Sequence, residues 1–209
     1  MHRIARPAAV VALALTLIAC TRDGEIKLIE KPPETRWRAV ATEQDRERLR
    51  SWRKAWIEAL PAARATAAGD IAAQGALFEP DQALLRAMPP SGDYKCRTFK
   101  LGSQPAGIDG FIAYPWFNCR VGRDGEMATL VKLDGSQRPV GRLYADADAR
   151  VIFLGTLQLG DERTSLSYRQ DDKRNMAGYV ERVGTTRWRL VLPYPAFESQ
   201  LDVIEMVPA

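Results

Sequence analysis

Carboxylates are the abundant side chains of this sequence that could perform acid–base chemistry. The 209 residues include 26 aspartates and glutamates but a single histidine, His2. A glycosidase needs two carboxyl groups that face each other across a cleft. Most of the neighbouring acids lie in expected turns, where aspartate bonds the local backbone. The pair that we would test for hydrolysis of envelope polysaccharide is Glu198 and Asp202, which follow the aromatic corner 193–197.

Cys20 is a candidate for a different reaction, covalent lipidation. Residues 17–20 read Leu-Ile-Ala-Cys, which is a lipobox, and they follow a basic start and the short uncharged apolar stretch 7–19. That stretch is too short to span a bilayer. We therefore expect a signal peptide at 1–19 and a lipid anchor on Cys20. The alternatives are an ordinary signal peptide, which Ile18 at position −3 disfavours, and an uncleaved single-span anchor.

The anchor predicts a compartment and limits the partners. The protein would lie in the cell envelope and face the periplasm, and Thr21 after the cysteine favours the outer over the inner membrane. Cleavage removes Arg3 and Arg6 and leaves 28 basic against 26 acidic residues, so the net charge does not indicate nucleic-acid binding. We expect the membrane as a partner, through the lipid, and no nucleic acid.

Cleavage also removes His2 and with it imidazole chemistry. A chain without histidine has no Ser-His-Asp catalysis and no histidine-ligated zinc. The sequence contains no Gly-x-Ser-x-Gly motif and no phosphate or dinucleotide loop. We therefore predict no catalytic residue, no metal site and no cofactor.

The two remaining cysteines, Cys96 and Cys119, are expected to form a disulfide. An isolated pair in an oxidising compartment is more often a bridge than two reactive thiols, and the spacing excludes a CxxC motif.

Several elements must position these groups. Residues 20–41 are expected to be a flexible tether, because their apolar residues are scattered and Pro32 and Pro33 oppose a helix. Residues 42–90 are expected to be helical, with helices over about 43–60, 62–68 and 80–88. Thr42 can cap the first of these helices, and Pro61 should break or restart it.

From residue 91 onward, short strand-like runs are separated by turn residues. They lie at 94–101, 111–121, 127–133, 139–144, 151–157, 165–169, 177–183, 187–192 and 201–206. Eight or nine strands without intervening helices predict an antiparallel, calycin-like β-barrel or curved sheet. The fold class is therefore α+β, with the N-terminal helices packed on the β domain 91–209 and residues 42–209 forming one folded unit. Pro115 within the second run indicates an edge, a bulge or a rim.

Six short motifs stand out along the chain: GDYKCRT at 92–98, FNC at 117–119, GSQR at 135–138, FLG at 153–155, RWRLVLP at 187–193 and ESQLDV at 198–203. In these motifs, and over roughly residues 37–208, the chain resembles a family of small bacterial envelope proteins of unknown function. The resemblance implies no activity and no catalytic residue. The strand count is similar to that of calycin-like barrels, which include periplasmic protease inhibitors and lipocalin-type lipid carriers, but architecture does not determine function.

Two sets of residues are candidates for a binding surface. They are the aromatic residues Tyr114 and Trp116, and the arginines Arg138, Arg142, Arg187 and Arg189. The aromatic residues could instead be core, and the arginines could be solvated with their stems over apolar rows. The first functional hypothesis is a non-enzymatic envelope lipoprotein that binds a partner protein or an apolar ligand. The alternatives are a histidine-free carboxylate hydrolase and a structural component of an envelope complex.

Overall fold

The computed structural model describes residues 34–104 and 107–209. A helical segment comes first, with α1 (Trp37–Val40), α2 (Glu43–Arg50), α3 (Trp52–Ala73) and the 3₁₀ helix η1 (Gly75–Phe78). The strands that follow are β1 (Gly92–Leu101), β2 (Phe111–Ala113), β3 (Phe117–Asp124), β4 (Met127–Lys132), β5 (Gln137–Ala147), β6 (Arg150–Leu159), β7 (Asn175–Gly184), β8 (Arg187–Pro193) and β9 (Leu201–Pro208). Cys20, the expected signal peptide and the expected tether up to residue 33 lie outside the described residues.

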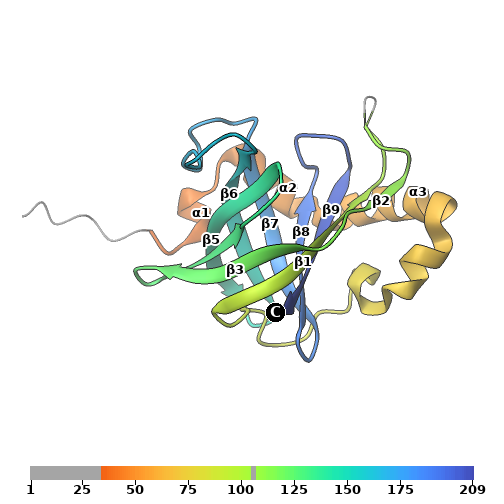
Figure 1. The fold of residues 1–209 in the computed structure, drawn as a ribbon, viewed down its shortest axis with the longest axis horizontal. Helices are drawn as coiled ribbons and strands as arrows, with labels where there is room; N and C mark the ends of the chain where they lie inside the picture. The colour runs from red at the N-terminus through yellow and green to blue at the C-terminus, as the bar shows by residue number, and fades with distance from the viewer. Residues whose placement is uncertain (1–33, 105–106) are drawn as a thin grey trace, which may run out of the picture. The chain divides into compact units, whose positions relative to one another are not determined.

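Eight of these strands form a closed antiparallel barrel. The hydrogen-bonded order is β1-β3-β4-β5-β6-β7-β8-β9, and β9 pairs back with β1. The short strand β2 pairs with the C-terminal end of β1 and adds a ninth strand. The helical segment packs against the outside of the barrel (Figure 1). The expected α+β class, with helices on an antiparallel barrel, is confirmed.

Alternation along the strands builds two apolar cores. Tyr94 and Cys96 of β1 point into the barrel, whereas Phe99 and Leu101 point outward to the helices. The inner core also includes Leu130, Leu143, Phe153, Val180, Trp188, Leu190, Ile204 and Met206. The outer core joins the sheet to α3 through side chains such as Trp56, whose indole Nε1 donates to the Tyr179 hydroxyl at 2.8 Å.

The strand β6 is buried on both faces, as its apolar sequence predicts. Residues 151–157 are all buried. Gly155 pairs directly with Gly141 of β5, and a Cβ built on Gly155 would lie 2.3 Å from the carbonyl oxygen of Val140 and 2.7 Å from the ring of Phe153. The two glycines therefore make room for the Phe153 ring inside the barrel.

The helical segment differs from the expected one. The single helix expected over 43–60 is divided at Ser51 into α2 and α3. The ordered chain begins before residue 42, because α1 lies in the expected tether and its Trp37 donates to Asp146 at 2.8 Å. Pro61 lies within α3, which continues past it and kinks at Ala67. Thr42 caps α2 as expected, through its hydroxyl and the amide of Asp45. No helix within the described residues is long and apolar enough to cross a membrane.

The expected third helix at 80–88 does not form. The chain there crosses the end of the barrel at which β1 begins, and its amides bond to the barrel. The amide of Leu84 donates to the backbone carbonyl of Arg182, and the amide of Ala87 donates to the backbone carbonyl of Asp148. Ala87 is buried in the inner core. These contacts with the barrel replace the hydrogen bonds of a helix.

Two expected strands also differ. The run 111–121 is divided into β2 and β3 by residues 114–116, around Pro115, whose ring nitrogen cannot donate to a ladder. Residues 165–169 form no strand, because they belong to the β6–β7 loop and bond to the helices. The hydroxyl of Tyr168 donates to Asp45 at 2.5 Å and accepts from the amide of Thr42.

Candidate ligand pocket in the barrel mouth

A pocket of about 460 Å³ opens at the end of the barrel opposite residues 80–88. Each of the eight barrel strands contributes a side chain to its lining, so the pocket lies in the lumen of the barrel. Residues 114–116 and the β4–β5 turn also line it, and the β8–β9 loop stands at this end, away from the C-terminus (Figure 1). We call it the mouth pocket. The barrel is therefore filled at one end and hollow at the other.

The walls of the mouth pocket are mainly apolar. They continue the inward-facing rows of the inner core toward the open end of the barrel. Their apolar side chains are Phe117, Pro139, Leu157, Met176, Leu192 and Ile204. Such walls hold the apolar part of a small molecule, and a volume in this range is usual for a ligand site.

The floor of the pocket holds a buried ion pair. The Lys100 ammonium lies 2.9 Å from Oδ2 of Asp202, and the two side chains are 6% and 8% exposed. The Ser199 hydroxyl donates to the other oxygen of Asp202. Glu198 places Oε2 3.3 Å from the same ammonium, although this buried oxygen accepts no hydrogen bond. Lys100 thus holds two carboxylates together.

Burial and charge oppose each other in this pair. Burial acts to lower the pKa of Lys100, but Asp202 and Glu198 outweigh it and hold the pKa above the ordinary value. Burial raises the pKa of Asp202 in spite of the ammonium and the Ser199 hydroxyl, which lower it. The 2.9 Å contact is that of a charged pair. Removing either charge would leave the other buried without a counter-charge, which is destabilising.

Lys132 is the second lysine of the pocket. It is half-buried at the end of β4, and its ammonium lies 4.0 Å from the centroid of the Phe117 ring. Burial lowers the pKa of Lys132, and the nearby charges of Arg138 and Lys100 act in the same direction. Asp134 opposes them without reversing the shift.

Exposed aromatic side chains lie around the opening. Tyr114 and Trp116, predicted as a binding surface or core, line the mouth pocket and are 38% and 47% exposed. Phe197 of the β8–β9 loop is 46% exposed. In the same loop, the hydroxyl of Tyr194 donates to Glu58 of α3 at 2.7 Å, and burial together with Glu58 raises the pKa of Tyr194 to about 12. The rim is thus fastened to the helices.

The predicted arginines do not gather into one patch. The Arg138 guanidinium donates to the carbonyl oxygens of Gly135 at 2.7 Å and Leu159 at 2.9 Å, so it holds the β4–β5 turn against β6. Arg142 points outward from β5 and pairs with Asp124 at 2.6 Å. Of the two, Arg138 lies beside the mouth pocket and Arg142 does not line it.

Arg187 and Arg189 lie on the outer face of β8, under the helical segment. Arg187 pairs with Glu205 at 2.6 Å. Arg189 is fully buried, pairs with Glu181 at 2.7 Å and donates to four backbone carbonyls between residues 76 and 80. The expectation of a binding surface does not hold for Arg189, because its donors are used to fasten the end of the helical segment to the barrel.

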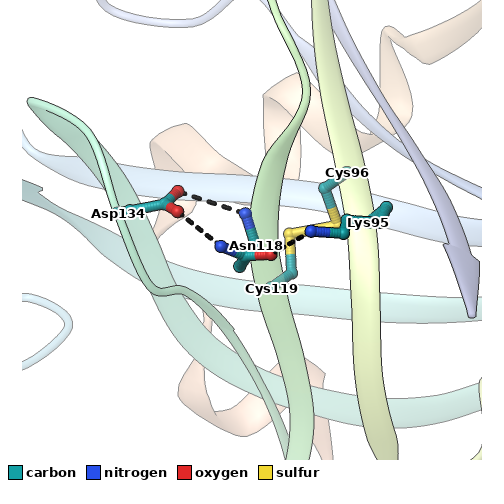
Figure 2. The surroundings of a disulfide bond; sticks show 5 residues. All are labelled: Lys95, Cys96, Asn118, Cys119 and Asp134. Carbon is teal, nitrogen blue, oxygen red and sulfur yellow. Dashed lines mark hydrogen bonds between the residues drawn. A yellow bond between two sulfur atoms is a disulfide. The ribbon is translucent and has the colours of Figure 1, made fainter. Parts of the chain in front are cut away.

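The disulfide joins Cys96 of β1 to Cys119 of β3, as expected. Figure 2 shows it beside Lys95, which donates to Asn118 at 2.8 Å, and Asp134, which accepts from both the amide and the side chain of Asn118. Both cysteines belong to the inner core, one inward position below Thr98 and Phe117 of the pocket lining. The bridge therefore supports the strands that form one side of the mouth.

Glu198 and Asp202, the pair considered for hydrolysis, do lie together at the pocket. They share one ammonium instead of facing each other across an open cleft, and Asp202 is buried. Lys100 pairs closely with Asp202 and more loosely with Glu198, whereas a glycosidase needs one protonated acid and one reactive carboxylate that the substrate can reach. It favours a structural role in a binding pocket.

Lys100 and Lys132 were not singled out from the sequence. Each occupies an inward position of its strand, two residues after Thr98 and Leu130 respectively. A charged residue at an inward position is the signal that could have identified them, because inward positions of a filled barrel are apolar. Within the described residues, no cluster of three potential ligand side chains could hold a metal ion.

Comparison with known proteins identifies a family but no characterised relative. No curated protein and no solved structure matches the chain. One family model, described as a domain of unknown function, matches residues 37–206, from α1 into β9. The chain therefore belongs to the DUF4893 family.

Proposed function

We propose that this protein is a non-enzymatic binding protein of the bacterial cell envelope, which takes a small apolar ligand into the mouth of its barrel. The observation that carries the proposal is the mouth pocket. All eight barrel strands line it, and the opposite end of the barrel is filled with side chains. A ligand would enter past Tyr114 and Trp116 and lie against the apolar walls.

The test is binding of N-phenyl-1-naphthylamine, a neutral apolar probe whose fluorescence rises when it leaves water. The full-length Cys20→Ser variant cannot be lipidated. We expect saturable binding that Thr98→Trp, which fills the pocket from β1, removes. Ser136→Trp at the exposed rim is a second blocking variant that places no strain on the core, and Thr164→Trp in the β6–β7 loop is the matched control.

Binding that both pocket variants reduce and the control leaves unchanged would support the proposal. Absence of binding, or equal binding by all three tryptophan variants, would refute it. Circular dichroism and the Tm of each variant show that the fold is retained.

A partner protein is a second candidate, which the exposed rim favours. Tyr114, Trp116 and Phe197 are large apolar side chains in contact with solvent at one end of the barrel. Exposed aromatic residues of this kind are common at protein interfaces. A photo-crosslinking amino acid at position 116, compared with one at the exposed Ile57 of α3, should yield a specific envelope adduct at the rim alone.

The envelope location rests on the lipobox in the sequence. Labelling cells with a fatty acid should mark the wild-type protein and leave the Cys20→Ser variant unmarked. Mass spectrometry that finds an intact, unacylated N-terminus on the native protein would refute this part of the proposal.

A further inference from the structure

Lys132 differs from Lys100 and Arg138, the other cations at the mouth, because its ammonium has no direct ion-pair or hydrogen-bond partner within the described residues. It is half-buried, and among residues 34–104 and 107–209 its ammonium forms no ion pair and no hydrogen bond; its contact is with the Phe117 ring at 4.0 Å. Removing an ammonium from water is unfavourable unless an anion or hydrogen-bond acceptors compensate. A single aromatic face supplies only part of that compensation.

The acid nearest in sequence is already engaged. Both oxygens of Asp134 accept hydrogen bonds from Asn118, one from its amide at 3.1 Å and one from its side chain at 2.8 Å (Figure 2). Asn118 in turn accepts from Lys95 at 2.8 Å. Asp134 is therefore held on Asn118 and forms no ion pair with Lys132, although its charge still acts on the Lys132 ammonium.

The other cations of the mouth are satisfied. Lys100 has Asp202 at 2.9 Å and Glu198 at 3.3 Å. Arg138 donates to the backbone carbonyls of Gly135 and Leu159. An anion that enters the pocket therefore finds one cation without a competing partner, and that cation stands beside the apolar walls.

We infer that the ligand of the mouth pocket is a free amphipathic anion, whose charged group is held by Lys132 and whose apolar part lies against Phe117, Leu157 and Leu192. The inference rests on the proposed function and adds the chemical class of the ligand. A pocket of about 460 Å³ holds a small molecule, which favours a free anion over a phospholipid.

Two probes that differ by one charged group test this inference. 8-Anilinonaphthalene-1-sulfonate is N-phenyl-1-naphthylamine with one added sulfonate. In the full-length Cys20→Ser protein we expect the sulfonate to lower the Kd by about tenfold, the size of one charge-assisted contact. Lys132→Met should abolish this preference, so that the variant binds the two probes with similar Kd values.

Two further variants separate recognition from general electrostatics. Lys132→Arg keeps the charge and should retain most of the preference. Lys54→Met removes an exposed lysine of α3 that does not line the pocket, and should leave the preference intact. Decanoate should displace the bound sulfonate probe, whereas decyltrimethylammonium and phosphatidylglycerol vesicles should not.

The outcomes distinguish the inference from the proposed function. If the neutral probe binds but the sulfonate confers no preference, or the preference survives Lys132→Met, the inference is wrong and the binding function stands. Displacement by phosphatidylglycerol vesicles and not by decanoate would also overturn it. If neither probe binds, both proposals fail.

Discussion

The ion pair in the pocket floor predicts that Lys100→Met destabilises the fold strongly. Lys100 and Asp202 are about one-twentieth exposed and 2.9 Å apart, so removing the ammonium leaves a buried carboxylate with the Ser199 hydroxyl alone. Breaking a buried pair in this way costs about 3–5 kcal/mol. The mouth pocket admits water above the floor, so we expect a loss of about 3 kcal/mol in the free energy of unfolding at pH 7.

The difference in the free energy of unfolding between the wild type and Lys100→Met should become smaller as the pH is lowered. Burial already raises the pKa of Asp202 in the wild type, and loss of the ammonium, which lowers it, raises it further. Between the ordinary aspartate pKa of the unfolded chain and this raised pKa, the folded variant binds more protons than the unfolded chain. Its free energy of unfolding therefore falls as the pH rises through that window and recovers toward acid.

Urea unfolding at pH 7 and pH 5, with the disulfide intact, measures both effects. Lys95→Met is the matched control, because it removes an exposed lysine, and it should change stability by less than about 0.5 kcal/mol. The double variant Lys100→Met/Asp202→Leu should recover most of the loss, since it removes the buried carboxylate, and Glu198, which is 38% exposed, can be hydrated. A Lys100→Met variant as stable as the control, or a double variant no better than the single one, would refute the reasoning.

Three further variants test the supports of the barrel by urea unfolding. Replacing Cys96 and Cys119 by alanine removes a bridge between residues 23 apart and should cost about 3 kcal/mol, as should reduction of the wild type; an unchanged stability would contradict this. Arg189→Met leaves Glu181 with Arg150 as its remaining partner and takes the donor from four backbone carbonyls, so it should cost about 3 kcal/mol, with faster amide exchange at residues 74–80. Unchanged protection of those amides would argue against a role of Arg189 in fastening this segment to the barrel. Gly155→Ala places a Cβ 2.3 Å from the backbone of the neighbouring strand and should cost about 1–3 kcal/mol, so a neutral effect would show that the strands can separate.

Much of the barrel could be predicted from the sequence because its strands alternate cleanly between turns. β8 is an example, since Trp188, Leu190 and Leu192 point inward and are expected to do so from their spacing. The errors fall where tertiary contacts replace local ones. Residues 165–169 have strand-like composition but bond to α2 through Tyr168, and residues 80–88 give their amides to the barrel instead of a helix.

The mouth pocket was predicted less well, because it depends on register between strands far apart in the sequence. Lys100 and Asp202 are direct partners across the β1–β9 seam, a pairing that exists only when the barrel closes. The local sequence pattern shows a charged residue in each of these strands, but it does not predict that Lys100 and Asp202 are neighbours. The inward-facing positions nevertheless carry a signal, because they change from apolar to charged toward the mouth. In β1 the change is from Cys96 to Lys100, and in β4 it is from Leu130 to Lys132.

This change of polarity argues that the hollow end is selected for binding and is not merely left unfilled. A barrel that needed only stability would continue its apolar rows to both ends, since a buried pair such as Lys100 and Asp202 is seldom more stable than apolar residues of the same volume. The closed end does continue them, with Val180, Trp188 and Met206. Charged groups at inward positions are concentrated instead around the pocket, where Lys132 contacts an aromatic ring and no carboxylate among the described residues. The proposed anionic ligand would account for both the open space and the lysine that has no ion-pair partner among the described residues.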